Sequence, residues 1–150
     1  MTEKICPFCQ PLPEYAHLDI ARFPLWRVAL HNNQYFPGRC LVILNRHAEN
    51  AFLEATEEEH REARVIMFAL WLATQKLFGA TLPNFANLEN EIRHAHWYLV
   101  PRYENPVVIN GETFKDELWG KNYAAYRRDF IIKPETEKLI ISQLKEELKL

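Results

Sequence analysis

One segment of this 150-residue chain has both a clear helix start and a clear helix end, and it constrains the fold more than any other. Thr56 is followed three residues later by Glu59, the capping-box arrangement that begins a helix. Gly79 is a typical residue just beyond a helix end. Between them, residues 65–73 are apolar on all sides, and such a helix must be covered on more than one side. A sheet covers only one side, so the second cover is either the C-terminal segment or a second copy of the chain. We expect a second copy, and therefore a homodimer.

Short strand patterns and turns occupy most of the remaining chain. The segments with strand patterns are residues 26–31, 40–44, 82–90 and 94–100. Pro37-Gly38 suits a tight turn, so the first two segments are expected to form an antiparallel hairpin. Residues 5–24 are rich in proline and polar residues and are expected to be irregular, and a second helix should run from near Pro134 to near residue 148. Because strands and helices do not alternate as βαβ units, we predict a single α+β domain over residues 1–150, with an antiparallel sheet, one long helix and a C-terminal helix.

Composition narrows the classes of function. The formal net charge of −2 provides no electrostatic reason to bind nucleic acid or an anionic membrane. The most apolar run, residues 65–73, is shorter than the roughly 20 residues that cross a bilayer, and the chain does not begin with a signal-peptide pattern. Two of the three cysteines form Cys6-Pro-Phe-Cys9, which fits a metal or redox motif in a reducing compartment better than a disulfide scaffold. We therefore predict a cytoplasmic protein with neither a nucleic-acid nor a membrane partner.

A row of three side chains carries the strongest chemical signal. His94, His96 and Tyr98 recur at every second position of a predicted strand and should share one face. A neutral imidazole is a nucleophile near neutral pH, because its unperturbed pKa is about 6.5. If a carbonyl or carboxylate holds one ring nitrogen, the other can attack phosphorus, and a neighbouring donor can serve the leaving oxygen. The alternative is a solvated strand face that happens to carry histidines. We interpret the row as catalytic.

The stretch from His94 to Pro101 resembles the signature of the histidine triad family of nucleotide hydrolases and transferases, and in particular its diadenosine tetraphosphate hydrolase branch. The hairpin, the long helix and an asparagine-containing strand extend the resemblance over about residues 5–105. The resemblance implies that His96 attacks the α-phosphate of a dinucleoside polyphosphate or nucleoside phosphoramidate and forms a nucleotidyl-histidine intermediate. It also implies that Asn84 and Asn90 contact the phosphates, and that the protein is a homodimer.

Tyr98 departs from this family pattern, which usually has a third histidine at its position. A phenol has a pKa of about 10, so it donates a hydrogen bond but exchanges protons less readily than imidazole near neutrality. The substitution leaves attack by His96 possible and places hydrolysis in question relative to nucleotidyl transfer. A second hypothesis therefore stays open, a zinc-stabilised nucleotide-binding sensor with little or no turnover. A third keeps the fold as an interaction scaffold without nucleotide.

Cys6 and Cys9 have the spacing of a metal-ligand pair. Cys-Pro-Phe-Cys also looks like a glutaredoxin active site, but only five residues precede it and prolines interrupt any following helix. By resemblance to zinc-binding histidine triad proteins and the related uridylyltransferases, His47 and His94 complete a ligand set. Two thiolates and two imidazoles make a closed, structural zinc site, in which His94 would be held in place. The alternative is two free thiols on a flexible start.

Overall fold

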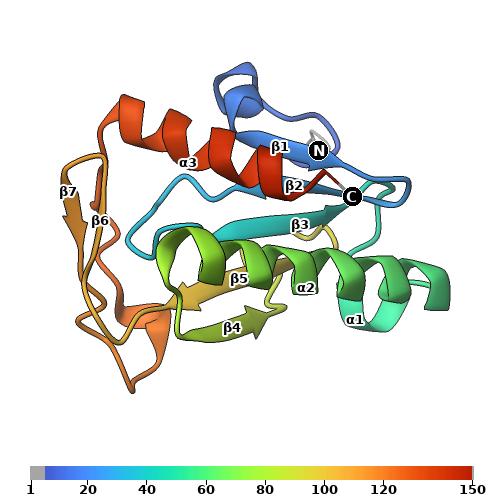
Figure 1. The fold of residues 1–150 in the computed structure, drawn as a ribbon. Coiled ribbons are helices and arrows are strands. Elements are labelled where there is room, and N and C mark those ends of the chain that lie inside the picture. The colour runs from blue at the N-terminus through green and yellow to red at the C-terminus, as the bar shows by residue number, and fades with distance from the viewer. Residues whose placement is uncertain (1–5, 150) are drawn as a thin grey trace.

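An antiparallel sheet with helices on one face forms the computed structural model, which describes residues 6–149 (Figure 1). The five strands lie in the order β1-β2-β3-β5-β4, with antiparallel pairings throughout. They are β1 (Asp19–Arg22), β2 (Trp26–Leu30), β3 (Cys40–Leu44), β4 (Leu82–Ala86) and β5 (His96–Arg102). The helices are α1 (Ala51–Glu54), α2 (Glu57–Phe78) and α3 (Pro134–Glu147), with 3-10 turns η1 (Pro13–Leu18) and η2 (Tyr123–Ala125). The predicted α+β class is confirmed, whereas a single domain over residues 1–150 stays a prediction.

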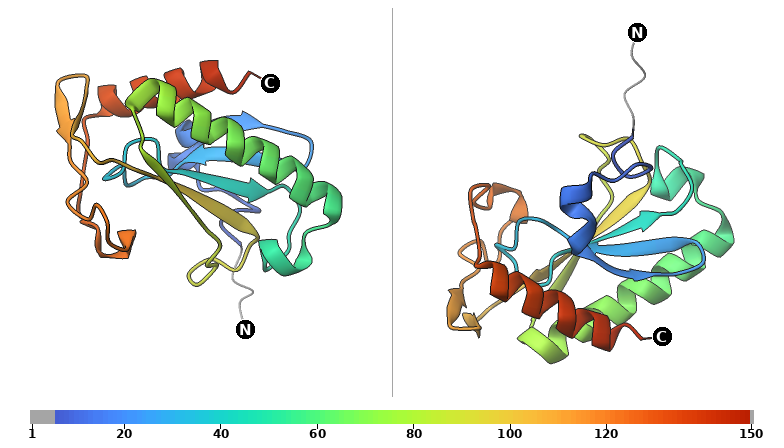
Figure 2. Two further views of the ribbon diagram at one scale, coloured as in Figure 1. Left: turned by 60° about the horizontal axis from the view of Figure 1, so that its bottom comes forward. Right: turned by 90° about the horizontal axis from the view of Figure 1, so that it is seen from above.

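The two long helices cover the same face of the sheet (Figures 1 and 2). Helix α2 packs against β2, β3 and β5, and α3 packs against β1 and beside α2. The core between these layers includes Trp26 and Val42 from the sheet and Ile66 and Leu70 from α2. The N-terminal segment with η1 lies on the opposite side of the sheet (Figure 2). Within residues 6–149, no helix is long and apolar enough to cross a membrane.

Strand alternation separates an apolar face from a functional one. On β5, Trp97 and Leu99 pack with the core beneath the helices, whereas His96 and Tyr98 line cavities on the other face. The predicted alternation is therefore confirmed for these residues. The predicted start of the strand at His94 is wrong by two residues, because the Ala95 and His96 amides do not begin a ladder: they donate to the Ala48 carbonyl and to the Glu89 carboxylate.

Helix α2 begins and ends where the capping pattern predicts. The Thr56 hydroxyl accepts from the Glu59 amide, the Glu59 carboxylate accepts from the Thr56 amide, and Gly79 ends the helix in the left-handed region at φ 72°. Helix α3 lies beside α2, but Val65 and Phe68 remain 55% and 61% exposed. The C-terminal segment therefore leaves part of the apolar surface of α2 uncovered.

The turn between β2 and β3 is held in place by Gln34 and packs closely against α2. The Gln34 side chain accepts from the Gly38 amide and donates to the Arg39 carbonyl. Gly38 has φ 83°, and a Cβ there would lie 2.9 Å from Thr74 of α2, so only glycine fits this approach. The predicted hairpin is confirmed, with Leu30 opposite Cys40 next to the turn. These contacts hold Arg39 in a defined place on the functional face.

Two stretches differ from the expectations. The segment expected to be irregular, residues 5–24, is described from residue 6 onward and is not wholly irregular there, because β1 pairs with β2 and an ion pair joins Asp19 to Arg27. The strand expected at residues 82–90 ends at Ala86, and Glu89 then takes a positive φ of 50° that breaks the extended path. A loop therefore separates β4 from β5 and delivers Glu89 and the residues after it to the functional face.

Helix α3 confirms the helix predicted from near Pro134, but between Tyr103 and α3 the chain has structure that the sequence patterns did not predict. A second, two-stranded sheet pairs β6 (Val107–Ile109) with β7 (Glu112–Phe114). Asn110 and Gly111 connect them with positive φ values of 51° and 76°, the geometry that an Asn-Gly hairpin turn requires. From there the chain runs back along the molecule through η2 to α3 (Figure 1).

Candidate functional site

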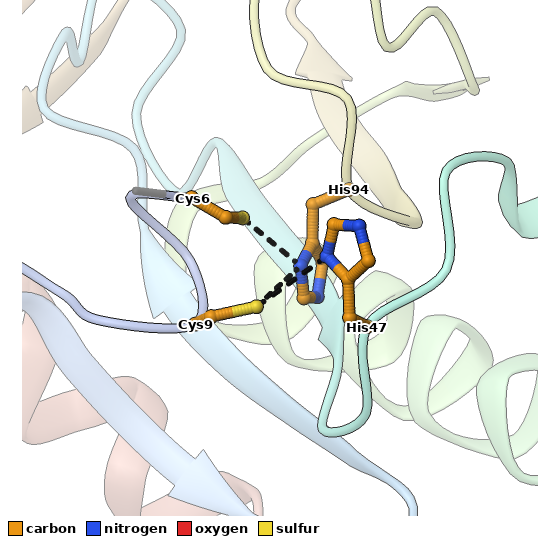
Figure 3. A group of neighbouring side chains, drawn as sticks. All are labelled: Cys6, Cys9, His47 and His94. Atoms are coloured by element: carbon orange, nitrogen blue, oxygen red, sulfur yellow. Dashed lines mark hydrogen bonds between the residues drawn. The ribbon is translucent and has the colours of Figure 1, made fainter. Parts of the chain in front are cut away.

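Four predicted metal ligands converge at one end of the functional face, where their side chains point toward one another (Figure 3). The donor atoms of Cys6, Cys9, His47 and His94 all lie within 4.8 Å of one another. Nδ1 of His94 is 3.3 Å from Sγ of Cys6 and 3.5 Å from Sγ of Cys9, and Nδ1 of His47 is 3.4 Å from Sγ of Cys9. Tetrahedral zinc holds sulfur and nitrogen ligands roughly 3.5 Å apart. The donor types and their spacing therefore fit zinc.

Three separate parts of the chain bring these ligands together. Cys6 and Cys9 face the cluster from an N-terminal turn in which the Cys9 amide donates to the Cys6 carbonyl at 3.1 Å. His47 follows β3, and His94 precedes β5. His94 is buried, and its Nε2–H donates to the Leu44 carbonyl at 2.8 Å, which leaves Nδ1 facing the thiols. Burial is the main cause of a lowered His94 pKa, which favours the neutral form that binds metals.

His96 has the arrangement expected of a nucleophilic imidazole. Its Nδ1–H donates to the His94 carbonyl at 2.6 Å, which leaves Nε2 with a free lone pair. The ring is 2% exposed, and burial is the main cause of a lowered His96 pKa. The neutral, attacking form is therefore present at neutral pH. The carbonyl partner that the sequence argument required is supplied by the backbone two residues earlier.

Glu89 positions His96 from the loop between β4 and β5. Its carboxylate accepts from the His96 amide at 3.1 Å and from the Ala51 amide at 2.7 Å. It also accepts from the Asn50 and Asn87 side chains, at 2.6 Å and 2.7 Å. These bonds compensate a buried negative charge and tie the loop, the start of α1 and the start of β5 to one point.

Tyr98 lies on the same face as His96, with their ring centroids 5.0 Å apart. Burial is the main cause of a raised Tyr98 pKa, so the phenol stays protonated at neutral pH. It can donate a hydrogen bond but is a weak proton donor. The guanidinium carbon of Arg39 lies 5.3 Å from its ring centroid, and the His31 ring is 6.0 Å away.

Two adjoining cavities open on this face. The larger has a volume of about 350 Å³, and its apolar lining includes Phe8, Leu12, Leu18, Ala29, Leu41 and Ile43. The smaller, of about 190 Å³, is lined by polar side chains that include Arg39, Glu89, Asn90, His96 and Arg128. His31 and Tyr98 line both cavities. The larger cavity, called here the apolar chamber although Asp19, Arg27, Asn32 and Glu91 also line it, therefore adjoins a polar chamber that contains the candidate nucleophile.

The two predicted phosphate contacts lie in different places. Asn90 lines the smaller cavity beside His96. Asn84 lies on β4, where its side-chain oxygen accepts from Arg102 at 3.0 Å, and it is not among the residues lining either cavity. The structure thus brings Asn90, but not Asn84, to the polar chamber.

The sequence patterns missed Arg39 and the segment near Tyr126. Arg39 is 5% exposed, and its Nε and Nη1 have no hydrogen-bond partner among the described residues. Its guanidinium carbon lies 4.7 Å from the Tyr126 ring centroid, and that of Arg128 lies at the same distance from this ring. The aromatic-basic stretch at residues 126–128 was a possible signal, but only folding shows that it reaches the polar chamber.

Comparison with known proteins identifies the fold. Neither a protein-family model nor a curated protein matches the sequence. A hypothetical histidine triad nucleotide-binding protein from Sulfolobus tokodaii is 18% identical, with 95% of this chain and 91% of that chain covered and a TM-score of 0.69. A Zn-bound histidine triad family protein from Mycobacterium smegmatis is 19% identical, covering 86% and 84%, with a TM-score of 0.57. A diadenosine triphosphate hydrolase from Plasmodium falciparum is 13% identical, covering 87% and 76%, with a TM-score of 0.62.

The structural neighbours are thus histidine triad proteins, and this chain has the histidine triad fold. The resemblance noted in the sequence is confirmed at this level. Its fold places His96, Tyr98 and a four-ligand cluster on one face of one sheet.

Proposed function

We propose that the protein is a nucleotide hydrolase or nucleotidyl transferase of the histidine triad type, with His96 as its nucleophile. The observation that carries the proposal is the buried His96 imidazole, whose Nδ1–H is held by a carbonyl and whose Nε2 is free beside a polar chamber. Structural neighbours that include a diadenosine triphosphate hydrolase support this class of activity. The substrate class proposed is a dinucleoside polyphosphate or a nucleoside phosphoramidate.

The proposed reaction has two steps. Nε2 of His96 attacks the α-phosphorus, an N–P bond forms, and the bond from phosphorus to the leaving group breaks. Water or another acceptor then attacks the same phosphorus and releases the nucleotide from His96. The Tyr98 hydroxyl would donate a hydrogen bond to the leaving atom. The apolar chamber has the size and lining to take the nucleoside, and Asn90 would contact the phosphates from the polar chamber. Asn84, bonded to Arg102, would contribute only indirectly.

We propose that Cys6, Cys9, His47 and His94 hold a structural zinc ion. Zinc would tie the N-terminal turn to the residue whose carbonyl orients His96, and a reducing, cytoplasmic location would keep both thiols available. The Zn-bound neighbour supports this proposal. Metal analysis of the purified protein should find about one zinc per chain, and Cys6→Ser should lose it. Cys40→Ala removes a thiol outside the cluster and should keep the metal.

We also propose a homodimer. Val65, Phe68 and Leu72 are exposed along one side of α2, and Leu82 and Phe85 are exposed on the edge strand β4. Exposed apolar side chains at this spacing on α2 are typical of an association site. Sedimentation should give the mass of two chains for the wild type and of one chain for Phe68→Glu. A wild-type monomer would contradict the proposal.

The first experiment is turnover of diadenosine tetraphosphate and of adenosine phosphoramidate. His96→Ala should lose about a thousandfold or more in kcat, and a nucleotidyl adduct should be found by mass spectrometry on the wild type alone. His60→Ala is the matched control, because His60 lies on α2 and not among the residues that line the cavities. Turnover that survives in His96→Ala would overturn the assignment of the nucleophile.

The sensor remains the second candidate, and Tyr98 favours it. A phenol held protonated by its raised pKa is a poor general acid for a leaving group that must take a proton. Nucleotide binding without turnover in the wild type, with turnover appearing in Tyr98→His, would identify the protein as this sensor.

A further inference from the structure

We propose that Arg39, assisted by Arg128, forms an anion subsite for the phosphate chain that leaves when His96 is nucleotidylated. This inference rests on the proposed function and deepens it: it assigns two residues and selects substrates with a polyphosphate leaving group over phosphoramidates. Neither arginine belongs to the stretch that resembles the family signature.

The first support is the state of Arg39. The side chain is almost fully buried, yet its Nε and Nη1 lack hydrogen-bond partners among the described residues. Burying a charged group without partners is costly, so native proteins rarely do it. A ligand anion would supply the missing acceptors.

The second support is that Arg39 is held in place. The Gln34 side chain binds its carbonyl at 3.0 Å, and its own amide donates to the Phe36 carbonyl at 3.0 Å. Its guanidinium carbon lies 5.3 Å from the Tyr98 ring centroid and 4.7 Å from the Tyr126 ring centroid. Little side-chain entropy would be lost on binding a ligand, and the cation borders the chamber that contains His96.

The third support is the distribution of charge around the chamber. Arg128 stacks on the same Tyr126 ring and lines the same chamber as Arg39. Of the two acidic residues that line it, Glu89 is already bonded to two amides and two asparagine side chains. Glu91 is exposed and forms no ion pair among the described residues. Arg128 is exposed as well, so the buried charge of the chamber that lacks partners among the described residues is the Arg39 guanidinium.

Phosphate is the anion that this arrangement suits. A guanidinium offers donors in a fixed fork that matches phosphate oxygens. When Nε2 of His96 bonds to the α-phosphorus, the bridging P–O bond breaks and its electron pair leaves with the next phosphate. Arg39 would meet that developing charge. A polyphosphate can leave as an anion, whereas an amine must first gain a proton, which Tyr98 supplies poorly. Arg39 and Tyr98 thus both favour a polyphosphate over an amine as the leaving group.

Binding measurements test the subsite apart from the chemistry. In a zinc-loaded His96→Asn background, which cannot be adenylylated at position 96, calorimetry compares AMP with ATP in the absence of Mg²⁺. We expect ATP to bind at least about tenfold more tightly, and Arg39→Gln to abolish that gain while AMP binding stays within about threefold. Arg127→Gln is the matched control, because Arg127 is exposed and is not among the residues lining the chamber. Equal affinities for AMP and ATP, or a gain that survives in Arg39→Gln, would overturn the proposal.

Kinetics supply a second, independent measurement. In the protein that retains His96, Arg39→Gln should lower kcat/KM for diadenosine tetraphosphate by about a hundredfold. The same substitution should lower kcat/KM for adenosine phosphoramidate by less than about threefold. Equal losses for both substrates would remove the leaving-group role. If the wild type turned over neither substrate but Arg39 still discriminated ATP from AMP, the subsite would stand and the proposed enzyme activity would fail.

Discussion

Arg39 and Arg102, two of the buried arginines on the functional face of this sheet, differ in their hydrogen bonding. Arg102, at the end of β5, donates to both carboxylate oxygens of Asp116, to the Leu118 and Lys121 carbonyls and to Asn84. Arg39, at the hairpin turn, is 5% exposed against 3% for Arg102, yet two of its nitrogens lack protein partners. Burial alone therefore does not tell a structural arginine from one that binds a ligand; the supply of acceptors does.

Arg102 also helps to position the surroundings of Arg39. By binding Asp116 and the carbonyls of Leu118 and Lys121, Arg102 fixes the segment that continues into η2 and Tyr126. Tyr126 in turn stacks on Arg39. The hydrogen bonds of Arg102 thus help to hold Tyr126, which lines the polar chamber of the candidate site.

Replacing Arg102, whose guanidinium is fully hydrogen-bonded, should have the largest effect on stability. Arg102→Met leaves Asp116 buried without its cation, and we expect the free energy of unfolding in urea to fall by about 3 to 5 kcal/mol. Adding Asp116→Leu should restore most of that loss, because no unpaired charge remains. Arg127→Met, at an exposed arginine, should change stability by less than about 0.5 kcal/mol. A loss below about 1 kcal/mol for Arg102→Met would contradict the structural role that distinguishes Arg102 from Arg39.

Replacing Arg39, two of whose nitrogens lack partners among the described residues, should change the free energy of unfolding by less and in the opposite direction. Arg39→Met replaces an uncompensated buried cation by an apolar chain of similar length, so we expect the ligand-free protein to be about 1 to 2 kcal/mol more stable. The same urea titrations measure it. Inorganic tripolyphosphate should raise the melting temperature of the wild type and not of Arg39→Met. A destabilisation as large as that of Arg102→Met would show that Arg39 has a structural role.

The smallest predicted effect is on acid stability. Burial is the main cause of the lowered His31 pKa of about 3, and the charges of Arg39, Arg128 and His96 lower it further. The unfolded side chain takes a proton near pH 6.5 while the folded one stays neutral, so stability falls as pH falls from 6.5 toward 3. We expect a loss of about 1 to 2 kcal/mol from this source by about pH 5.5, and none in His31→Asn. Urea titrations at several pH values measure the slopes; equal slopes in the wild type and in His31→Asn would contradict the prediction.

Patterns that depend on neighbouring residues were predictable. The capping box and Gly79 defined α2, and the turn at Pro37-Gly38 defined the hairpin. The alternation of His96 and Tyr98 placed both on one face. The metal cluster was reached by family resemblance, and its donors do converge. The strand limits near Ala86 and His94 were wrong, because Glu89 takes a positive φ after β4 and its carboxylate accepts the His96 amide before β5.

The sequence by itself therefore determined the two long helices, the hairpin, the shared face of His96 and Tyr98 and the residue type of the nucleophile, since local hydrogen bonding and side-chain periodicity act over a few residues. Only the tertiary structure decided which arginine is satisfied. Most partners of Arg102, and the Tyr126 ring beside Arg39, come from residues 116–126. Whether a buried charge is compensated depends on which groups the fold brings within hydrogen-bond distance, and no spacing in the sequence encodes that distance directly.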